Sequence, residues 1–227
     1  MDTQNVTSSN SAAQAVSQFG LSLFKKQAAR DKEKNVLVSP ASAAIALSMT
    51  MNGARTSTLE AMKSTLGFGA GETIETINAA VEAMISALTD PESGVTLKVA
   101  NAIWASQNIK FNDDFIQGVT DAFKAKVTNA DMQAEGTVGD INGWADENTN
   151  GKITEIVKQI SPDTVMILLN AIYFKGKWTE EFDKANSSDG QFAGQNGAET
   201  ATFMRKFDSL KYYQDATCQA VSLPFGK

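Results

Sequence analysis

The side chains that most often carry enzyme chemistry are scarce in this sequence. Its 227 residues include no histidine and a single cysteine, Cys218. Without histidine, the chain by itself cannot assemble a Ser-His-Asp or Cys-His group or the common zinc sites. One cysteine forms no intrachain disulfide, and the apolar, strand-like run ATCQAVSLPF around it predicts a buried, unreactive thiol.

The remaining candidate motifs also lack the arrangement that catalysis needs. The carboxylates of Asp113-Asp114 and Glu180-Glu181 are adjacent in the sequence and point in different directions, which is not the geometry of an acid/base pair. The glycine-rich stretch GFGAGET, which begins at Gly67, follows a predicted helix and lacks the Lys-Ser/Thr of a phosphate loop. We therefore predict a plain interhelix loop there, and a protein that is not an enzyme and has no cofactor or metal.

A single amide stands within the most apolar run of the chain. Residues 163–176 read DTVMILLNAIYFKG, in which the asparagine is Asn170. A run this rich in Val, Ile, Tyr and Phe predicts a strand that is buried on both faces. An unpaired buried amide costs on the order of 1–3 kcal/mol, so Asn170 must find hydrogen-bond partners elsewhere in the chain.

Charge and hydropathy argue against two classes of partner. The chain has 26 acidic and 20 basic residues and a pI near 4.8, which predicts that it binds neither nucleic acid nor an anionic membrane surface. No apolar stretch reaches the roughly 18 residues of a membrane span, and the start MDTQNVTSSNSAAQ has neither the basic end nor the apolar core of a secretory signal. We expect a soluble chain, and its compartment stays open.

The elements that must position Asn170 begin with helices. Apolar residues recur at helical spacing over residues 11–30, and NVLVS at 35–39 predicts a short strand. Ser39 is a good N-cap and Pro40 suits the first helical position, after which small and Met side chains continue to Asn52-Gly53. Such small side chains predict close packing of this second helix against another element.

Two further helices follow in the first half of the chain. Ser57, with Glu60 three residues later, predicts a capping box for a third helix that stops at Gly67. The fourth helix runs from Thr73 to about residue 88, with one apolar stripe and an acidic opposite face.

The second half mixes strands and helices. A strand is predicted from Gly94, and a helix from Asn112 to residue 126. Another helix is capped by Thr137 and ended by Asn150-Gly151. The strand of Asn170 comes next, and turns and short strands fill the rest, the last over residues 211–227.

Three blocks of this sequence resemble the serpin family. They are NVLVSPASAAIALSMTMNGARTSTLEAMKSTLGF, INGWADENTNGKITEIV and TVMILLNAIYFKGKWTEEF, in serpin order and spacing. The resemblance covers nearly the whole chain and implies an α+β serpin fold, in which N-terminal helices pack on a large central β-sheet beside smaller sheets. We expect one serpin domain over residues 1–227 that is incomplete at its C-terminal side.

The resemblance also implies which residues guide the opening of the central sheet. The "shutter" behind the sheet corresponds to Ser39, Ser42, Asn142 and Asn170, and we expect Ser39 and Asn170 to be hydrogen-bonded, directly or through one water. In the family a histidine from a later strand is the third partner. No histidine is present here, so we expect Asn170 to be partly unsatisfied.

The KGKW block corresponds to the "breach", where the reactive-centre loop of a serpin first enters the sheet. Its members here are Lys175 and Trp178. An isolated buried Trp would most often be a core residue. The breach assignment therefore depends on the family resemblance.

The function implied by the resemblance is suicide-substrate inhibition of a serine or cysteine protease. The loop that the target protease would cleave has no counterpart in these residues, so we expect this chain alone to be inactive. The alternatives are a non-inhibitory serpin with a carrier, chaperone or storage role, and a catabolic enzyme, which the missing histidine and nucleophile elbow disfavour.

The expected partners follow from the same resemblance. The fourth helix binds heparin in some serpins, but no Lys or Arg lies between Gly71 and Glu92, so we expect no heparin site there. We expect a monomer in full-length form. The family resemblance favours an extracellular or periplasmic location.

Overall fold

The computed structural model describes residues 3–32, 34–194 and 197–227. The chain divides into two compact units, of which the first comprises Met1–Asp31, Val36–Asp90 and Leu97–Tyr173. The second comprises Lys32–Asn35, Pro91–Thr96 and Phe174–Lys227. Among the described residues, no helix is both long and apolar enough to cross a membrane.

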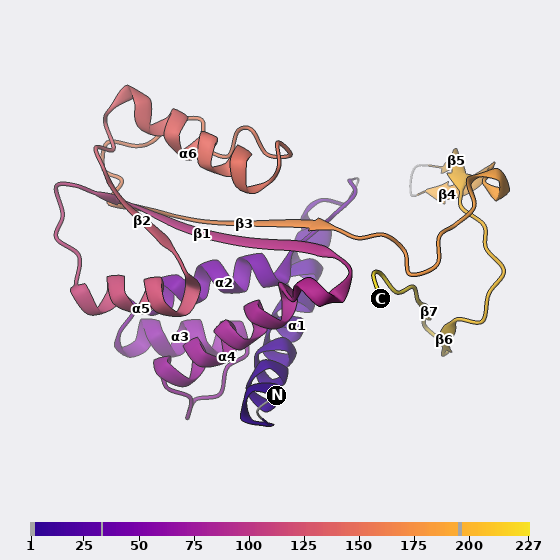
Figure 1. Ribbon diagram of the computed structural model, residues 1–227, viewed down its shortest axis with the longest axis horizontal. Coiled ribbons are helices and arrows are strands. Elements are labelled where there is room, and N and C mark those ends of the chain that lie inside the picture. The colour runs from indigo at the N-terminus through magenta and orange to yellow at the C-terminus, as the bar shows by residue number, and fades with distance from the viewer. Residues whose placement is uncertain (1–2, 33, 195–196) are drawn as a thin grey trace. The chain divides into compact units, whose positions relative to one another are not determined.

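Helices dominate the first unit (Figure 1). They are α1 (Thr3–Arg30), α2 (Pro40–Met51), α3 (Thr56–Leu66), α4 (Ile74–Leu88), α5 (Asp113–Phe123) and α6 (Glu135–Asn148). The strands of its sheet are β1 (Thr96–Ser106), β2 (Lys126–Ala130) and β3 (Met166–Lys175).

Local signals in the sequence account for most of the helix ends. Ser39 precedes α2 and its hydroxyl accepts from the N–H of Ser42, as its N-cap position predicts. Thr73 caps α4 in a reciprocal capping box with Thr76. Gly67 ends α3 in the left-handed conformation, at φ 84°, which glycine adopts without steric cost. These boundaries confirm the predicted first and last residues of α2 and α4 and the predicted C-terminal end of α3.

Three local predictions were wrong. Helix α3 begins at Thr56, so Ser57 lies inside the helix and cannot cap it. Helix α6 begins at Glu135, and Thr137 is a buried residue of its first turn whose hydroxyl donates to the carbonyl of Asp131 (2.7 Å). Residues 35–39 form no strand, because no described strand pairs with them and a strand requires a hydrogen-bonded neighbour.

The sheet of the first unit has the strand order β2-β1-β3. Strands β1 and β2 are parallel, in a register that runs from Ala102 opposite Lys126 to Ser106 opposite Ala130. Strand β2 was not predicted, because the helix before it was expected to extend to residue 126. That helix, α5, ends instead at Phe123, where Lys124 adopts a left-handed conformation at φ 51°.

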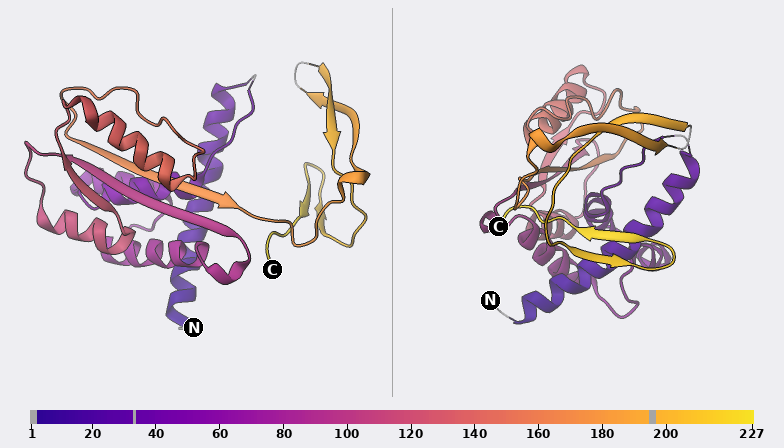
Figure 2. Two further views of the ribbon diagram at one scale, coloured as in Figure 1. Left: turned by 45° about the horizontal axis from the view of Figure 1, so that its top comes forward. Right: turned by 90° about the vertical axis from the view of Figure 1, so that its right-hand side faces the viewer.

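Alternating side chains of the strands face two separate apolar cores. On one face, residues such as Ile103 of β1 and Leu168 of β3 belong to the larger core with α1, α2, α4 and α5. On the other face, Trp104 and Leu169 pack with α6, and the ring of Trp104 meets that of Trp144 edge to face, with centroids 5.8 Å apart. Figures 1 and 2 show α6 on one side of the sheet and α2 to α5 on the other.

The second unit consists of short elements. Its strands and single-turn helices are η1 (Pro91–Ser93), η2 (Lys184–Asn186), β4 (Ser188–Gly194), β5 (Gly197–Phe203), β6 (Lys211–Gln214) and β7 (Gln219–Ser222). Strands β4 and β5 form one antiparallel pair, and β6 and β7 form another. Cys218 lies in the turn between β6 and β7 and is exposed, so the prediction of a buried thiol was wrong. A turn at Asp215 separates two short strands, and Cys218 lies in that turn. The apolar residues on both sides of it have the pattern of one strand and do not reveal the turn.

Candidate functional site

Asn170 lies near the middle of β3 on the face that is turned toward the helices. Its neighbours on the same face, Leu168 and Ile172, pack against the larger core, whereas Leu169 and Ala171 pack on the α6 side. The period-two alternation of a strand therefore places the amide of Asn170 in an otherwise apolar layer. That amide is half-buried and needs partners from within the protein.

Four residues from four elements form a continuous hydrogen-bond chain through this layer. The hydroxyl of Ser42 on α2 donates to Oδ1 of Asn170. Nδ2 of Asn170 donates to Oδ1 of Asn101 on β1 (2.8 Å). Nδ2 of Asn101 donates to the carbonyl oxygen of Phe123, the last residue of α5 (2.7 Å). We call these residues the amide chain; it ties α2 and α5 to both β1 and β3.

The direct form of the predicted bond between Ser39 and Asn170 is replaced by the bond from Ser42, and the form bridged by one water stays a prediction. As the N-cap, Ser39 uses its side chain on the first turn of its own helix, where it accepts from the Ser42 N–H (3.4 Å). Residues three positions apart lie on the same face of a helix, so Ser42 remains next to that cap and its hydroxyl reaches the strand. The structure thus brings Ser39, Ser42 and Asn170 together, with Ser42 as the direct partner.

The expectation that Asn170 would be partly unsatisfied was also wrong. Both polar atoms of its side chain have partners, because Ser42 donates to Oδ1 and Asn101 accepts from Nδ2. Asn101 was missed because it was read as part of an alternating strand, VANAIW. Its position could have been a signal, since an amide at an inward position of a buried strand needs a partner as much as Asn170 does.

Asn142 is not part of the amide chain. It lies on α6, on the opposite side of the sheet from α2 (Figure 1). Its Nδ2 donates to the carbonyl of Val157 (2.8 Å), and its Oδ1 accepts from the amides of Ile156 (2.8 Å) and Val157 (3.0 Å). Asn142 therefore fixes the segment after α6 to the middle of that helix, and its predicted role in the shutter stays a prediction.

The two predicted breach residues are in or next to an aromatic cluster of the second unit. The indole of Trp178 stacks on Phe225, with ring centroids 4.1 Å apart and an interplanar angle of 18°. Phe182 and Phe174 meet this pair edge to face. Backbone bonds hold the stack, from Thr179 N to the carbonyl of Pro224 (3.0 Å) and from Gly226 N to that of Lys177 (2.9 Å). Lys175 is exposed.

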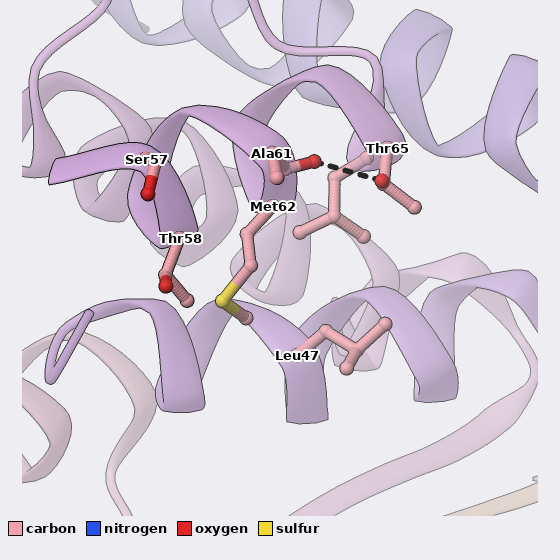
Figure 3. Close-up of a pocket in the computed structure, with 7 residues that line it drawn as sticks. Leu47, Ser57, Thr58, Ala61, Met62 and Thr65 are labelled. Carbon is pink, nitrogen blue, oxygen red and sulfur yellow. Dashed lines mark hydrogen bonds between the residues drawn. The ribbon is translucent and has the colours of Figure 1, made fainter. Parts of the chain in front are cut away.

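A cavity of about 540 Å³ lies between α2 and α3 (Figure 3). Leu47 of α2 faces the side chains of α3 across it, and the hydroxyl of Thr65 is already bonded to the carbonyl of Ala61 (2.7 Å). Its lining has no charged side chain and includes none of the predicted site residues; the lining residues are Leu47, Ser57, Thr58, Ala61, Met62, Thr65 and Leu66. Such a lining offers mainly apolar contact, and the residues that line it include no acid or base that could activate the hydroxyls of Ser57, Thr58 and Thr65.

The comparison with known families identifies one family that covers most of the chain. The model of the family described as "Serpin (serine protease inhibitor)" matches residues 14–227. The chain belongs to the serpin family. The predicted family and the predicted serpin fold, with helices packed on a sheet, are therefore confirmed.

Individual relatives show how much of a serpin these residues cover. Serpin-ZX of Arabidopsis thaliana is 33% identical over 178 residues, which are 76% of this chain and 46% of the relative. The crystal structure of tengpin, a thermophilic serpin in the latent state, superposes with a TM-score of 0.83 at 32% identity, over 100% of this chain and 59% of tengpin. The chain spans about half the length of the curated relatives that it matches.

A third comparison concerns a serpin fold with a bound ligand. The structure of human thyroxine-binding globulin complexed with thyroxine has a TM-score of 0.86 and covers 97% of this chain and 61% of that protein. The sequence identity is 23%, so this likeness supports the fold alone.

Proposed function

We propose that the protein is a suicide-substrate inhibitor of a serine or cysteine protease. The observation that carries the proposal is the match of the serpin family model to residues 14–227, and among the described residues β3 pairs with β1 alone. The free edge of a strand presents unpaired N–H and C=O groups that can accept an added strand. Membership of the serpin family supplies the reason to expect that strand to be a cleaved reactive-centre loop.

The proposed chemistry is carried out by the target protease. Its serine or cysteine attacks the scissile carbonyl of the loop, the C–N bond breaks, the amine leaves with a proton, and an ester or thioester joins the loop to the protease. Insertion of the loop beside β3 then moves and distorts the bound protease before water can cleave that bond. This chain supplies the sheet that receives the loop and no catalytic group.

The amide chain supports a specific role in this insertion. Because Asn170 bonds to both Ser42 and Asn101, a movement of β3 relative to α2 or β1 must break at least one of these bonds. We propose that Ser39, Ser42 and Asn170 control the opening of the sheet, and that Lys175 and Trp178 lie where the loop first enters. Asn142 would act indirectly, by holding the segment between α6 and β3.

The direct test is the formation of a covalent complex. The full-length protein, expressed with its own sequence beyond Lys227, is incubated with a panel of serine and cysteine proteases and analysed on denaturing gels. We expect a complex that survives denaturation with at least one protease, and none when the nucleophile of that protease is blocked beforehand. Residues 1–227 alone should give no complex with any protease, since the loop that would be cleaved is not among them.

A non-inhibitory serpin is the second candidate, because the serpin fold also occurs in thyroxine-binding globulin complexed with thyroxine. It predicts a different outcome in the same assay, namely cleavage of the loop without a covalent complex across the whole protease panel. That result would refute the inhibitory proposal while leaving the serpin fold in place.

We also propose that α4 contributes no glycosaminoglycan site. Its exposed face carries Glu75 and Glu82, and the only cation paired with this face in the described residues is Lys124, whose Nζ lies 3.2 Å from Oε1 of Glu82. A sulfated polymer would meet repulsion from these carboxylates. Replacing both glutamates with glutamine removes repulsion only, so retention of the protein on a heparin column should stay unchanged or rise slightly. A heparin site on α4 would instead be recognised by a loss of retention when its cations are replaced.

A further inference from the structure

Two Asn-Gly pairs lie wholly within the described residues, and neither belongs to the amide chain. They are Asn52-Gly53, directly after α2, and Asn150-Gly151, in the turn after α6. The backbone nitrogen of the glycine in such a pair can attack the side-chain amide of the asparagine, because glycine has no Cβ that hinders the approach. The two pairs are chemically equal in the sequence, so a difference between them must come from the fold.

The fold protects Asn52, which is 7% exposed. Its Nδ2 donates to the carbonyl of Ser48 (2.9 Å) and to Oδ1 of Asn78 (3.1 Å), and its Oδ1 accepts from Nδ2 of Asn78 (2.8 Å). The N–H of Gly53 donates to the carbonyl of Thr50 (3.0 Å). Attack at Asn52 would therefore have to break a reciprocal amide pair between α2 and α4.

Asn150 lies instead in an exposed turn of defined shape. Its φ is 51° and that of Gly151 is 74°, so two consecutive residues are left-handed. The hydroxyl of Thr149, which is 2% exposed, donates to the carbonyl of Ala145 (2.7 Å) and accepts from the N–H of Ile153 (2.9 Å). These bonds fix both ends of the turn and leave the Asn150 side chain at the surface.

A cation lies at the side-chain carbonyl of Asn150. Nζ of Lys98, on β1, donates to Oδ1 of Asn150 (3.1 Å), although the two residues are 52 positions apart. Attack on Cγ moves negative charge onto this oxygen, and an ammonium group that already contacts it stabilises that charge. Asn52 has no such partner, since its Oδ1 accepts from a neutral amide.

The nucleophile at this turn is the backbone nitrogen of Gly151. Its N–H donates to the carbonyl of Asp146 (2.9 Å), and this bond must open before the nitrogen can react. A Cβ built on Gly151 would meet one atom within 4 Å outside the adjacent residues, Oδ1 of Asp146 at 3.8 Å. The space around the nitrogen is therefore open, and a reaction here breaks fewer hydrogen bonds than one at Asn52.

We propose that Asn150 is a site of spontaneous deamidation that Lys98 promotes. The nitrogen of Gly151 gives its proton to hydroxide and bonds to Cγ of Asn150, the bond between Cγ and Nδ2 breaks, and ammonia leaves after taking a proton from water. The resulting succinimide is opened by water to aspartate or isoaspartate. Either product places a carboxylate beside Lys98, and isoaspartate also lengthens the backbone of the turn. The proposal does not depend on the proposed inhibitory function.

Peptide mapping by mass spectrometry tests the site in the full-length protein. The protein is incubated at neutral pH, folded and unfolded in urea, and the conversion of amide to acid is followed at Asn52 and Asn150. The two rates should be similar in the unfolded chain. In the folded protein Asn150 should convert about thirty-fold faster than Asn52, the effect of two fewer net hydrogen bonds to break.

Variants at Lys98 test how the fold promotes the reaction. Lys98→Ala should slow conversion of Asn150 about two- to five-fold in the folded protein, the contribution of an exposed charge, and should change nothing in the unfolded chain. Lys98→Arg keeps a cationic donor and should stay close to the unmodified protein. The matched control is Lys110→Ala, which removes an exposed lysine beyond the other end of β1 and should have no effect.

Two results would overturn the proposal. One is a rate at Asn150 in the folded protein that is no faster than the rate at Asn52. The other is an unchanged rate in Lys98→Ala, or a decrease that is equal in the folded and the unfolded protein. The assay needs no protease, so its failure leaves the inhibitory function untouched, and the absence of covalent protease complexes would leave the deamidation site untouched.

Discussion

The strongest stability prediction concerns the centre of the amide chain. Asn170→Ala removes the bond from Ser42 and the bond to Asn101 in a single substitution. The two partners are left in different situations. The hydroxyl of Ser42 is only half-buried, whereas Asn101 is 5% exposed and its Oδ1 is left without a donor.

The magnitude follows from these two environments. A net hydrogen bond contributes about 0.5–1.5 kcal/mol, and a buried polar atom that loses its partner costs about 1–3 kcal/mol. For the half-buried Ser42 we take the low end of the range for a net hydrogen bond. For the buried Asn101 we take the middle of the range for a polar atom that loses its partner. We therefore expect Asn170→Ala to lower the free energy of unfolding by about 2–3 kcal/mol, which for a domain of this size lowers Tm by about 5–10 °C.

The assay is thermal and urea unfolding of the variant beside two controls. Ser42→Ala removes only one bond and should cost about 1 kcal/mol. Asn129→Ala makes the same substitution at an exposed residue of the neighbouring strand β2 and should stay within about 0.5 kcal/mol of the unmodified protein. A loss of stability in Asn170→Ala no larger than that in Asn129→Ala would show that the amide chain contributes nothing to the fold.

Three further predictions test other parts of the structure. Gly67→Ala should destabilise the protein by about 1–3 kcal/mol, because φ is 84° and a Cβ there would lie 3.1 Å from a backbone oxygen of α1, whereas Gly71→Ala, with no atom within 4 Å, should be near neutral in thermal unfolding. Ser48→Ala should raise Tm, since the Ser48 hydroxyl is buried without a hydrogen-bond partner in the described residues and alanine is the better helix former. The amide and hydroxyl of Thr217 donate to Asp215 and hold its pKa well below the ordinary 3.8. The folded β6–β7 turn should therefore keep this carboxylate ionised as pH falls below that value, and the stability that it gives should decrease progressively from there to the lower pKa of the folded state, which carboxyl-carbon NMR can follow.

Local sequence signals predicted the elements that carry the candidate site. The second helix, α2, was located correctly because Ser39, Pro40 and Asn52 are helix start and stop signals that act within one turn of the chain. Strand β3 was located correctly because an apolar run bounded by turn residues leaves few alternatives. The polar residue within that run correctly indicated that partners had to come from elsewhere.

Contacts between distant segments were out of reach for the same reasoning. Asn101 and Asn170 are 69 residues apart, and nothing in either local pattern identifies the other. Strand β2 has only five residues and gains its identity from parallel pairing with β1, across the whole of α5. Ser42 was named from the family resemblance, but its place as the direct partner of Asn170 depends on the rotation of α2 against the sheet, which only the packed structure fixes.

The position of the amide chain on one face of the sheet bears on how β3 and β1 would part. On the α6 side, the residues that hold the strands together are apolar, including Ala102, Leu169 and Ala171. Apolar contact weakens gradually as surfaces separate, in rough proportion to the area exposed. On the α2 side, the Asn170–Asn101 bond is 2.8 Å long, and a hydrogen bond is lost once its atoms move about 1 Å further apart.

The apolar contacts and the amide chain therefore resist separation in different ways. The apolar contacts, which the larger core supplies on the α2 side as well, oppose movement at every distance, whereas the amide chain opposes the first ångström and then releases completely. Small fluctuations of β3 against β1 are suppressed by the amide chain, and once its bonds are broken the remaining resistance comes from the backbone hydrogen bonds between the two strands and from apolar contact. Under the proposed function the strand enters at the other edge of β3, so β3 moves relative to α2 and breaks the bond between Ser42 and Asn170; substitution of Asn170 should thus speed spontaneous opening more than it changes the final stability of a sheet that has accepted a strand. The comparison of opening rates with the melting temperature of the loop-inserted form measures that difference, and equal effects on both would contradict the argument.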